Sequence, residues 1–150
     1  MSHFTLVPKE ISAIRKHVQE RCTTFELLTA CLWKCRTVAL EFDPEEIVRL
    51  SIIANLRGKK HQNLHIPSGY YGNGFGFPAV TSQAGPGQPG TVLKWNFIVS
   101  NNTRVGFGEI DFSWGKALCA GPARIAVPIC LPEFAMERFC QELKRVIGKP

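Results

Sequence analysis

Three stretches of the chain space their apolar residues as an amphipathic helix does, every three or four positions. The first, 8–22, begins with a proline, which suits a first helical turn. The second, 23–40, has a wide apolar face, and Thr23 and Glu26 stand at the spacing of a capping box. The third, 132–148, also begins with a proline and ends with basic residues and a glycine. The pattern therefore predicts three helices.

Shorter runs rich in branched and aromatic residues predict β-strands between these helices. The run "IVRLSIIANL" at 47–56 is rich in branched aliphatic residues, as in a buried strand. The other predicted strands are 4–7, 75–80, 92–100 and 124–132. Helices and strands that alternate in this way favour an α/β fold, in which the helices cover a mixed sheet.

Two segments lack a packing pattern and are predicted as connections. The segment after the second predicted strand mixes glycines with polar residues, and it begins with Arg57, Lys59 and Lys60. Residues 82–91, "SQAGPGQPGT", hold almost no side chain that could pack, so they predict a flexible connector or seam. We expect a single domain over 1–150 with this Pro/Gly-rich seam inside it.

Composition and charge are those of a soluble, folded protein and choose no partner. Hydrophobic residues make up 45% and charged residues 20%, which is ordinary for a globular chain. The net charge of +6 is spread evenly, so no basic arm stands out. The first ten residues lack the pattern of a signal peptide, and no apolar run approaches the roughly 18 residues of a membrane helix. We therefore expect a cytoplasmic protein without a membrane partner, and the oligomeric state stays open.

Residues able to bind metal are present, but not at a metal-binding spacing. His61 and His65 are four apart, yet they fall in a loop close to Pro67, so we expect no metal site. The cysteines have no CxxC spacing, and in a reducing compartment we expect them to be buried, small hydrophobic residues without disulfides. The six are Cys22, Cys31, Cys35, Cys119, Cys130 and Cys140.

Aromatic residues gather on the predicted strands of the second half, where they could stack on nucleic-acid bases. They are Trp95, Phe97, Phe107, Phe112 and Trp114. Few basic residues are interleaved with them, so a sheet core is the better explanation, and we expect no nucleic-acid partner.

The run "EIDFSWGKA" at 109–117 puts an aspartate, two aromatic residues and a glycine within nine positions. Two interpretations are open from the residues alone. Asp111 could be a base or metal ligand beside Trp114, or it could hold a tight turn in place through an ion pair.

This run resembles the DFGWG signature of the plant BAHD acyltransferases, with Ser113 where the family usually has glycine. The matching residues are Asp111, Phe112, Ser113, Trp114 and Gly115. Other segments resemble the family in the same order. "TTFELLTACLWKCRTVAL" is similar to its Ser/Thr-Phe-Glu helix, "NLRGK" and "PSGYYGNGFGFPAV" to its Asn-x-Arg strand end and Gly-Tyr-Phe-Gly-Asn loop, and "VPICLPEFAMERFCQEL" to its closing strand and helix. The resemblance covers nearly all of 4–148, and the closest branch is that of the alcohol acyltransferases similar to benzyl alcohol benzoyltransferase.

The resemblance implies transfer of an acyl group from acyl-CoA to a small alcohol, with acyl-CoA as co-substrate and no metal. The reaction needs a general base, and in the family this is the histidine of an HxxxD motif. No histidine of this sequence is followed by an aspartate four positions later. The resemblance therefore implies an acyltransferase fragment that lacks its base and is inactive alone. The alternative is a non-catalytic CoA-binding or interaction module that pairs with a full-length relative.

In fold, the resemblance is to the carboxy-terminal part of the family, whose second domain is similar to chloramphenicol acetyltransferase. The chain is a shortened form of it. Before "TVLKWNFIVS" the family has further helical sequence, where this chain has only "PGQPG", and after "CAGPA" the family continues into a strand that is missing here. Such losses would expose apolar faces of the sheet. A truncated paralogue and a wrongly joined gene model would both give this pattern.

The resemblance also places residues near the ligands, which in the family lie between its two halves. The residues implied near coenzyme A are Thr23, Thr24, Arg57, Lys59 and Lys60. A helix start and cationic side chains suit a pyrophosphate. For Thr23 the role of a plain N-cap is the stronger alternative. Arg104 falls where some members of the family contact the acceptor, and a solvated strand arginine explains it equally well.

Asp111 has a structural role in the family's pattern, as the partner of the Asn-x-Arg arginine. The resemblance therefore implies an ion pair between Asp111 and Arg57. If the pair is buried, removing one partner would cost about 3–5 kcal/mol. Ser113 stands where a glycine could serve a positive φ.

Overall fold

The computed structural model describes residues 2–57, 66–83, 93–102, 113 and 125–148. The chain divides into two compact units, one of Met1–Phe42 with Asn101–Pro150 and the other of Asp43–Ser100. The described residues form helices and strands in the first unit and strands in the second. The chain is therefore a mixed α/β protein. The expectation of a single domain over the whole chain stays a prediction.

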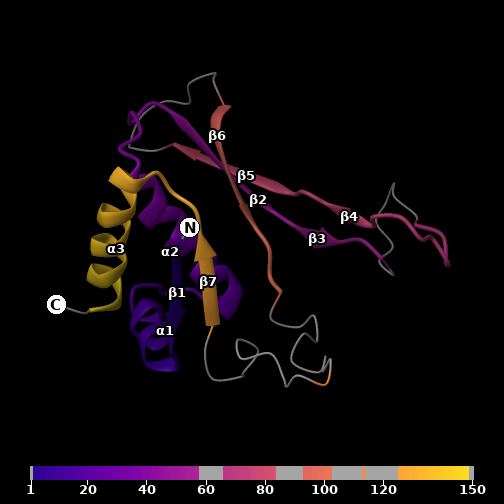
Figure 1. The fold of residues 1–150 in the computed structure, drawn as a ribbon, viewed down its shortest axis with the longest axis horizontal. Helices are drawn as coiled ribbons and strands as arrows, with labels where there is room; N and C mark the ends of the chain where they lie inside the picture. Colours follow the sequence, from indigo (N-terminus) through magenta and orange to yellow (C-terminus); the bar gives the residue numbers. More distant parts are fainter. Residues whose placement is uncertain (1, 58–65, 84–92, 103–112, 114–124, 149–150) are drawn as a thin grey trace. The chain divides into compact units, whose positions relative to one another are not determined.

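In its described residues, the first unit contains three helices and a two-stranded ribbon (Figure 1). Its elements are β1 (Ser2–Leu6), α1 (Pro8–Arg15), α2 (Thr24–Ala39), β7 (Ile125–Ile129) and α3 (Glu133–Ile147). The ribbon pairs β1 antiparallel with β7, with Phe4 opposite Val127. It thereby brings the start of the described chain beside the strand that precedes α3.

Helix α2 forms where the sequence predicts it, and its first turn explains why it starts there. The Thr23 hydroxyl accepts a hydrogen bond from the Glu26 backbone N–H at 3.2 Å, and the Glu26 carboxylate accepts one from the Thr23 N–H at 2.7 Å. The two bonds satisfy backbone donors that have no partner within the helix. Six apolar residues and Thr29 on this helix are buried, which confirms the predicted apolar face.

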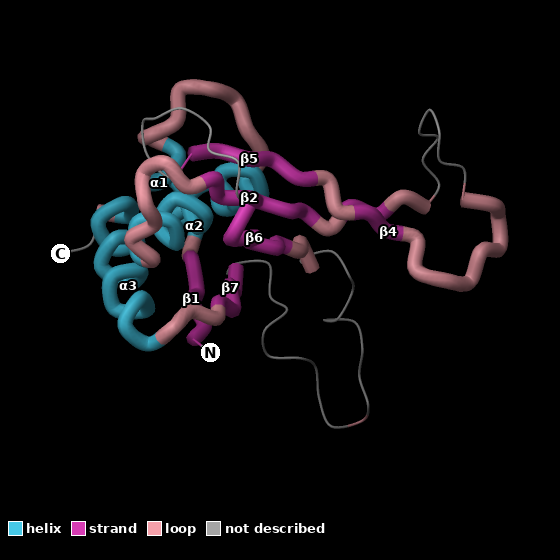
Figure 2. Tube along the Cα trace, turned by 90° about the horizontal axis from the view of Figure 1, so that it is seen from above, coloured by secondary structure: helices cyan, strands magenta, loops and turns pink. Residues whose placement is uncertain are grey.

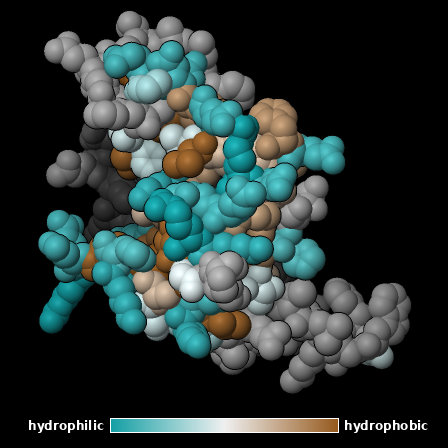
Figure 3. Space-filling model, turned by 90° about the vertical axis from the view of Figure 1, so that its left-hand side faces the viewer, coloured by the Kyte–Doolittle hydropathy of each residue, from teal (hydrophilic) through white to brown (hydrophobic). Residues whose placement is uncertain are grey.

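Helix α3 also confirms its prediction, with Pro132 before its first turn and Gly148 after its last. Gly148 has φ +70°, the left-handed conformation in which glycine ends many helices. The buried residues of α3 are Ala135, Phe139 and Leu143, which are four positions apart and so lie on one face of the helix. The opposite face is charged, and hydrophilic side chains predominate on the side of the molecule where α3 lies (Figure 3).

The core of the first unit lies where the three helices and the ribbon meet. Phe139 of α3 is fully buried, and its ring centroid lies 5.4 Å from that of Phe4 on β1. Arg138 ties α3 to the end of α2, because its Nε donates to the Ala39 carbonyl at 3.0 Å and its Nη1 pairs with Glu41 at 2.6 Å.

The described part of the second unit consists of strands and the segments that connect them. Its strands are β2 (Ile47–Ile52), β3 (Ala54–Asn55), β4 (Phe75–Gly76), β5 (Ala79–Gln83) and β6 (Leu93–Val99). Three of them form a sheet in the order β5-β2-β6, with β5 antiparallel and β6 parallel to β2 (Figure 2). The sheet is therefore mixed, as predicted, but has three strands. The short strands β3 and β4 pair with each other and not with this sheet.

The register of this sheet separates an apolar face from a polar one. Leu50 lies opposite Val80 on one side and Phe97 on the other, so these three side chains share a face. Ser51 points the other way, and its hydroxyl donates to the Asn96 side-chain oxygen at 2.9 Å. Leu50 is buried, whereas Val80 on the edge strand is 56% exposed.

Three predicted boundaries are wrong, each for a local reason. The first helix ends at Arg15 and not at Cys22, because the backbone N–H groups of Lys16, His17 and Val18 donate three residues back, as in turns, and not four. The strand predicted over 75–80 is divided into β4 and β5 by Pro78, which has no N–H for a ladder. Ser82 and Gln83, assigned to the seam, belong to β5, and the rest of the seam lies outside the described residues.

We predict that Phe139→Ala lowers the free energy of unfolding of the first unit by about 3–5 kcal/mol, because it empties a fully buried ring position. The matched control is Phe134→Ala on the same helix. Phe134 is 67% exposed and contacts Arg138 only through its ring face at 5.7 Å, so we expect a change below about 1 kcal/mol. Urea unfolding followed by helical circular dichroism measures both, and equal losses would contradict the placement of the core.

Candidate functional site

The start of α2 is one of the two places where the resemblance puts coenzyme A. Thr23 is the N-cap of the helix, as its alternative interpretation predicted, and both its N–H and its hydroxyl donate to Glu26. Thr24 is the first helical residue. The polar groups of Thr23 are therefore already engaged in holding the helix start.

Arg15 also belongs to this helix start, which the sequence did not indicate. Its guanidinium donates to the Cys22 carbonyl and, at 3.4 Å, to the Thr24 hydroxyl. No spacing rule could have identified it, since the two residues are joined only by the fold of residues 16–23. Arg15 adds a cation within reach of the helix N-terminus, where the helix dipole is positive.

The capping carboxylate has a lowered pKa. The Thr23 backbone N–H and then the Thr23 hydroxyl, both donating to Glu26, hold its pKa below the usual range. Because the folded pKa is depressed, the stabilisation is present above the ordinary glutamate pKa and is lost as the pH falls through the lowered value. A carboxylate at a helix N-terminus is also favoured by the dipole. The Glu26 carboxylate therefore lies at the helix start, where an external anion would otherwise bind.

The second candidate place is Arg57, directly after β3. Its guanidinium lies against the loop that follows, where Nη1 donates to the Tyr70 carbonyl at 2.6 Å and Nη2 donates to the Gly72 carbonyl. Its backbone N–H donates to the Asn55 side chain at 3.0 Å, which gives the asparagine of the Asn-x-Arg segment a clear purpose. The arginine thus binds backbone of its own chain.

The loop is shaped to receive this arginine. Gly74 is buried, and a Cβ added there would lie 2.8 Å from Cγ and 3.1 Å from Nε of Arg57. Only glycine leaves room for the arginine stem to pass so close to the backbone. The Arg57 guanidinium also lies 5.8 Å from the centre of the Tyr70 ring, within the range of a cation–π contact.

A shallow hollow of about 290 Å³ adjoins this loop. Leu56, Ile66, Tyr70 and Phe75 supply most of its apolar wall. Exposed aromatic side chains continue beside it, where the rings of Phe75 and Phe77 meet edge to face at 5.5 Å. The arrangement can hold a flat or apolar group, and the site presents no acid or base to it from the described residues that line it.

Most of the remaining predicted site residues lie outside the described residues. They are Lys59, Lys60, Arg104, Asp111, Phe112, Trp114 and Gly115, together with His61 and His65. Ser113 is described, exposed, and has φ +68°. This value lies in the left-handed region, as the family's usual glycine at this position led us to expect. The ion pair between Arg57 and Asp111 stays a prediction.

The cysteines correct one expectation. The five described cysteines are free, and Cys31 and Cys35 are buried as predicted. Cys22 and Cys140 are only half-buried, and Cys130, directly after the buried Ile129 at the end of β7, is exposed, so the expectation of buried cysteines is wrong for these three. Among the described residues, no three His, Cys, Asp or Glu side chains are grouped so that they could hold a metal ion. No helix in the described ranges is long and apolar enough to cross a membrane.

The sequence matches the profile of the Transferase family over residues 8–86, more than half of the chain. This chain belongs to that family, the BAHD acyltransferases. The match ends within the Pro/Gly-rich segment, close to the first place where the sequence indicates a loss.

Curated relatives support the alcohol acyltransferase branch. The chain is 40% identical to "Alcohol acyl transferase 2" of Malus domestica over 200 residues, which covers 95% of this chain and 43% of the relative. It is 41% identical over 206 residues to "Alcohol acyltransferase 16" of Actinidia chinensis var. chinensis, with 97% and 45% covered. The chain therefore spans less than half the length of the curated relatives it matches.

The alignments also indicate internal shortening. The match to the Malus protein extends over 200 positions, but 95% of a chain of 150 residues is only about 143 residues. About 57 of the aligned positions therefore have no residue in this chain. This agrees with the two internal losses inferred from the sequence.

We predict that Arg57→Lys loosens the loop, because an ammonium group cannot reach both carbonyls as the planar guanidinium does. The amide of Leu56, which donates to the Gly74 carbonyl at 2.9 Å, should exchange its hydrogen about tenfold faster, since hydrogen bonds to charged groups contribute about 1.5–3 kcal/mol. Arg21→Lys, at an exposed position of the first unit, serves as control. Unchanged exchange at Leu56, or the same change in the control, would contradict this role of Arg57.

Proposed function

We propose that this chain is part of an enzyme that moves an acyl group from acyl-CoA to the hydroxyl group of a small alcohol. The observation that carries the proposal is that relatives named alcohol acyltransferases align with 95% to 97% of the chain at about 40% identity. The described helices and sheets would then correspond to the second domain of the family's enzymes, which resembles chloramphenicol acetyltransferase, in shortened form.

The proposed reaction needs a base that removes the alcohol proton as its oxygen attacks the thioester carbonyl. The HxxxD motif that supplies this base in the family is absent from the sequence. Of the described histidines, His17 donates from its Nε2 to the Val146 carbonyl at 3.2 Å, so that nitrogen holds a proton and is not placed to accept one. We therefore propose that the chain alone does not turn over substrate.

The contacts of the described residues suggest that some residues of the proposed site hold the chain's own structure and others contact the ligands. Thr23 and Arg57 are engaged in contacts within the chain, which leaves Lys59 and Lys60 as the proposed contacts of the coenzyme A phosphates. Arg57 has five N–H donors, and the loop carbonyls use two of them, so a further pairing with Asp111 is compatible with this geometry. Arg104 is the proposed contact of the alcohol.

A second function is favoured by exposed aromatic side chains around the Arg57 loop. Tyr71 is fully exposed and Phe77 is 53% exposed, and aromatic residues gathered on a surface are typical of contacts with another protein. The chain would then be a non-catalytic module that binds a full-length relative.

We predict that the purified chain forms no ester from acetyl-CoA or benzoyl-CoA and simple alcohols above the level of a heat-killed sample, because its sequence lacks the HxxxD motif. Chromatography of the products measures this, with the full-length Malus relative as positive control. Turnover by the chain alone would overturn the proposal of inactivity.

The same preparation distinguishes the two functions. If the chain binds coenzyme A in calorimetry but does not co-elute with the full-length relative, the acyltransferase origin with a retained coenzyme site is supported. If it co-elutes with the relative and binds no coenzyme A, the interaction module is the better description.

A further inference from the structure

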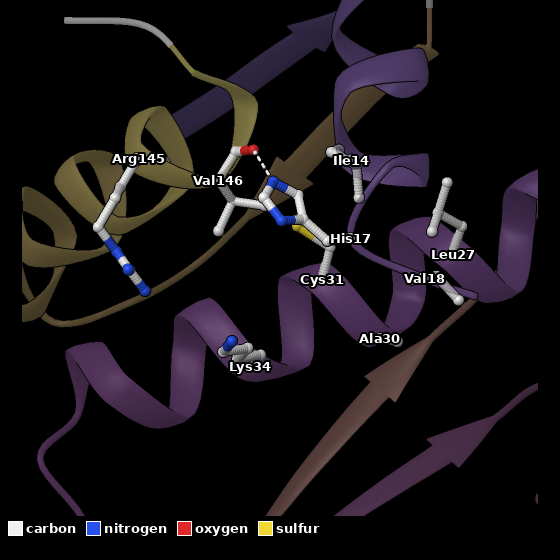
Figure 4. Close-up of a pocket in the computed structure, with 9 residues that line it drawn as sticks. All are labelled: Ile14, His17, Val18, Leu27, Ala30, Cys31, Lys34, Arg145 and Val146. Carbon is white, nitrogen blue, oxygen red and sulfur yellow. Dashed lines mark hydrogen bonds between the residues drawn. The ribbon is translucent and has the colours of Figure 1, made fainter. Parts of the chain in front are cut away.

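The three helices of the first unit enclose a hollow of about 270 Å³ (Figure 4). Its walls are mostly apolar, and Ile14, Leu27 and Val146 come one from each helix or its immediate end. A nucleophile lies in this wall, because Cys31 of α2 lines the hollow, and Figure 4 shows its sulfur directed from the helix toward the His17 ring. None of the residues implied near coenzyme A or the alcohol lines this hollow.

Cys31 has a second thiol beside it. Cys35 stands one turn later on α2 and is fully buried, whereas Cys31 lines the hollow. The hydrogen bond from Cys35 holds the pKa of Cys31 below its usual range, and the same bond raises the pKa of Cys35. The pair therefore favours one arrangement, in which Cys35 keeps its proton and Cys31 ionises more easily than an ordinary thiol.

The charged groups that face Cys31 are mainly cationic. Lys34 and Arg145 line the hollow, together with His17. Glu142 is the acidic group near the thiol pair and acts against ionisation of Cys31, as burial does. Its carboxylate is, however, paired with Arg145 at 2.6 Å. Lys34, three residues after Cys31 on the same helix, favours both the thiolate and an approaching anion.

We propose that Cys31 is a thiol–disulfide exchange site for low-molecular-weight disulfides that carry negative charge. The hollow supplies room for one half of such a molecule, the thiol pair supplies the nucleophile, and Lys34 with Arg145 attracts the charge. The site is distinct from the proposed transfer of an acyl group and needs none of its residues.

The exchange balances with the disulfide as the only co-reactant. Cys31 releases its proton to water, and its thiolate attacks one sulfur of the disulfide. A new sulfur–sulfur bond forms, the old one breaks, and the second half of the disulfide leaves as a thiolate with the electron pair. Cys31 is oxidised by this step, and the released half is reduced.

The product should persist as a mixed disulfide. Cys31 and Cys35 are four residues apart within one helix, where Cβ atoms are about 5–6 Å from each other. A disulfide requires a Cβ separation of about 3.5–4.5 Å. Cys35 can therefore not displace the bound half unless α2 unwinds, and it acts as a hydrogen-bond donor and not as a resolving thiol.

The test uses the full chain and two aromatic disulfides, dithiobis-nitrobenzoate, which carries two carboxylates, and dipyridyl disulfide, which carries none. The chain is treated with less than one equivalent of each, and the modified cysteine is identified by peptide mass mapping. Exposure alone would make Cys130 react first, since it is exposed and Cys31 is 8% exposed. We expect the anionic reagent to label Cys31 ahead of Cys130, and labelling of Cys130 first would overturn the proposal.

A charge variant provides the second readout. Lys34→Gln should slow the reaction of Cys31 with the anionic reagent about threefold or more, because the attraction of the anion is lost. The ratio of the rate with the anionic reagent to the rate with the neutral reagent should fall by the same factor. Lys144→Gln on α3, which does not line the hollow, is the matched control. An equal effect of Lys34→Gln on both reagents, or no effect, would overturn the anion preference. Release of two thiolates per labelled chain would instead show an internal disulfide and overturn the mixed product.

Discussion

The hydrogen bonds between the Arg57 guanidinium and the Tyr70 and Gly72 carbonyls are the contacts on which the second unit's irregular part depends. Backbone carbonyls outside helices and sheets need partners, and the described residues of this loop make few backbone hydrogen bonds with one another. A planar cation with several donors can satisfy two carbonyls at once. Gly74, which makes room for the arginine stem, belongs to the same constraint. Arg57 and Gly74, which lie in segments that resemble the family's motifs, therefore have a structural role in this chain.

The start of α2 follows the same logic. Thr23 and Glu26 satisfy each other's backbone donors, and Arg15 joins the helix start to the preceding connection. Both candidate coenzyme places are thus built from residues that first hold the chain's own backbone.

Much of the first unit could be predicted from the sequence, because its signals are local. The capping box at Thr23 and Glu26 and the glycine at the end of α3 each act within one turn of helix. Strand boundaries were less accurate, since Pro78 divides a run that the pattern joined. The roles of Arg57 and Arg15 could not be predicted, because their partners are backbone carbonyls 7 to 15 residues away that a loop brings near. The pairing of Arg57 with Asp111, in contrast, came from family resemblance and lies outside the described residues.

The central claim, that Arg57 serves the backbone of its own loop, can be measured directly by nuclear magnetic resonance of the arginine side chains. Two held Nη groups cannot rotate freely, so we expect separate, slowly exchanging Nη–H resonances for Arg57, with contacts to the Tyr70–Gly72 backbone. A single averaged resonance in rapid exchange with water, as for a solvated arginine, would contradict the account.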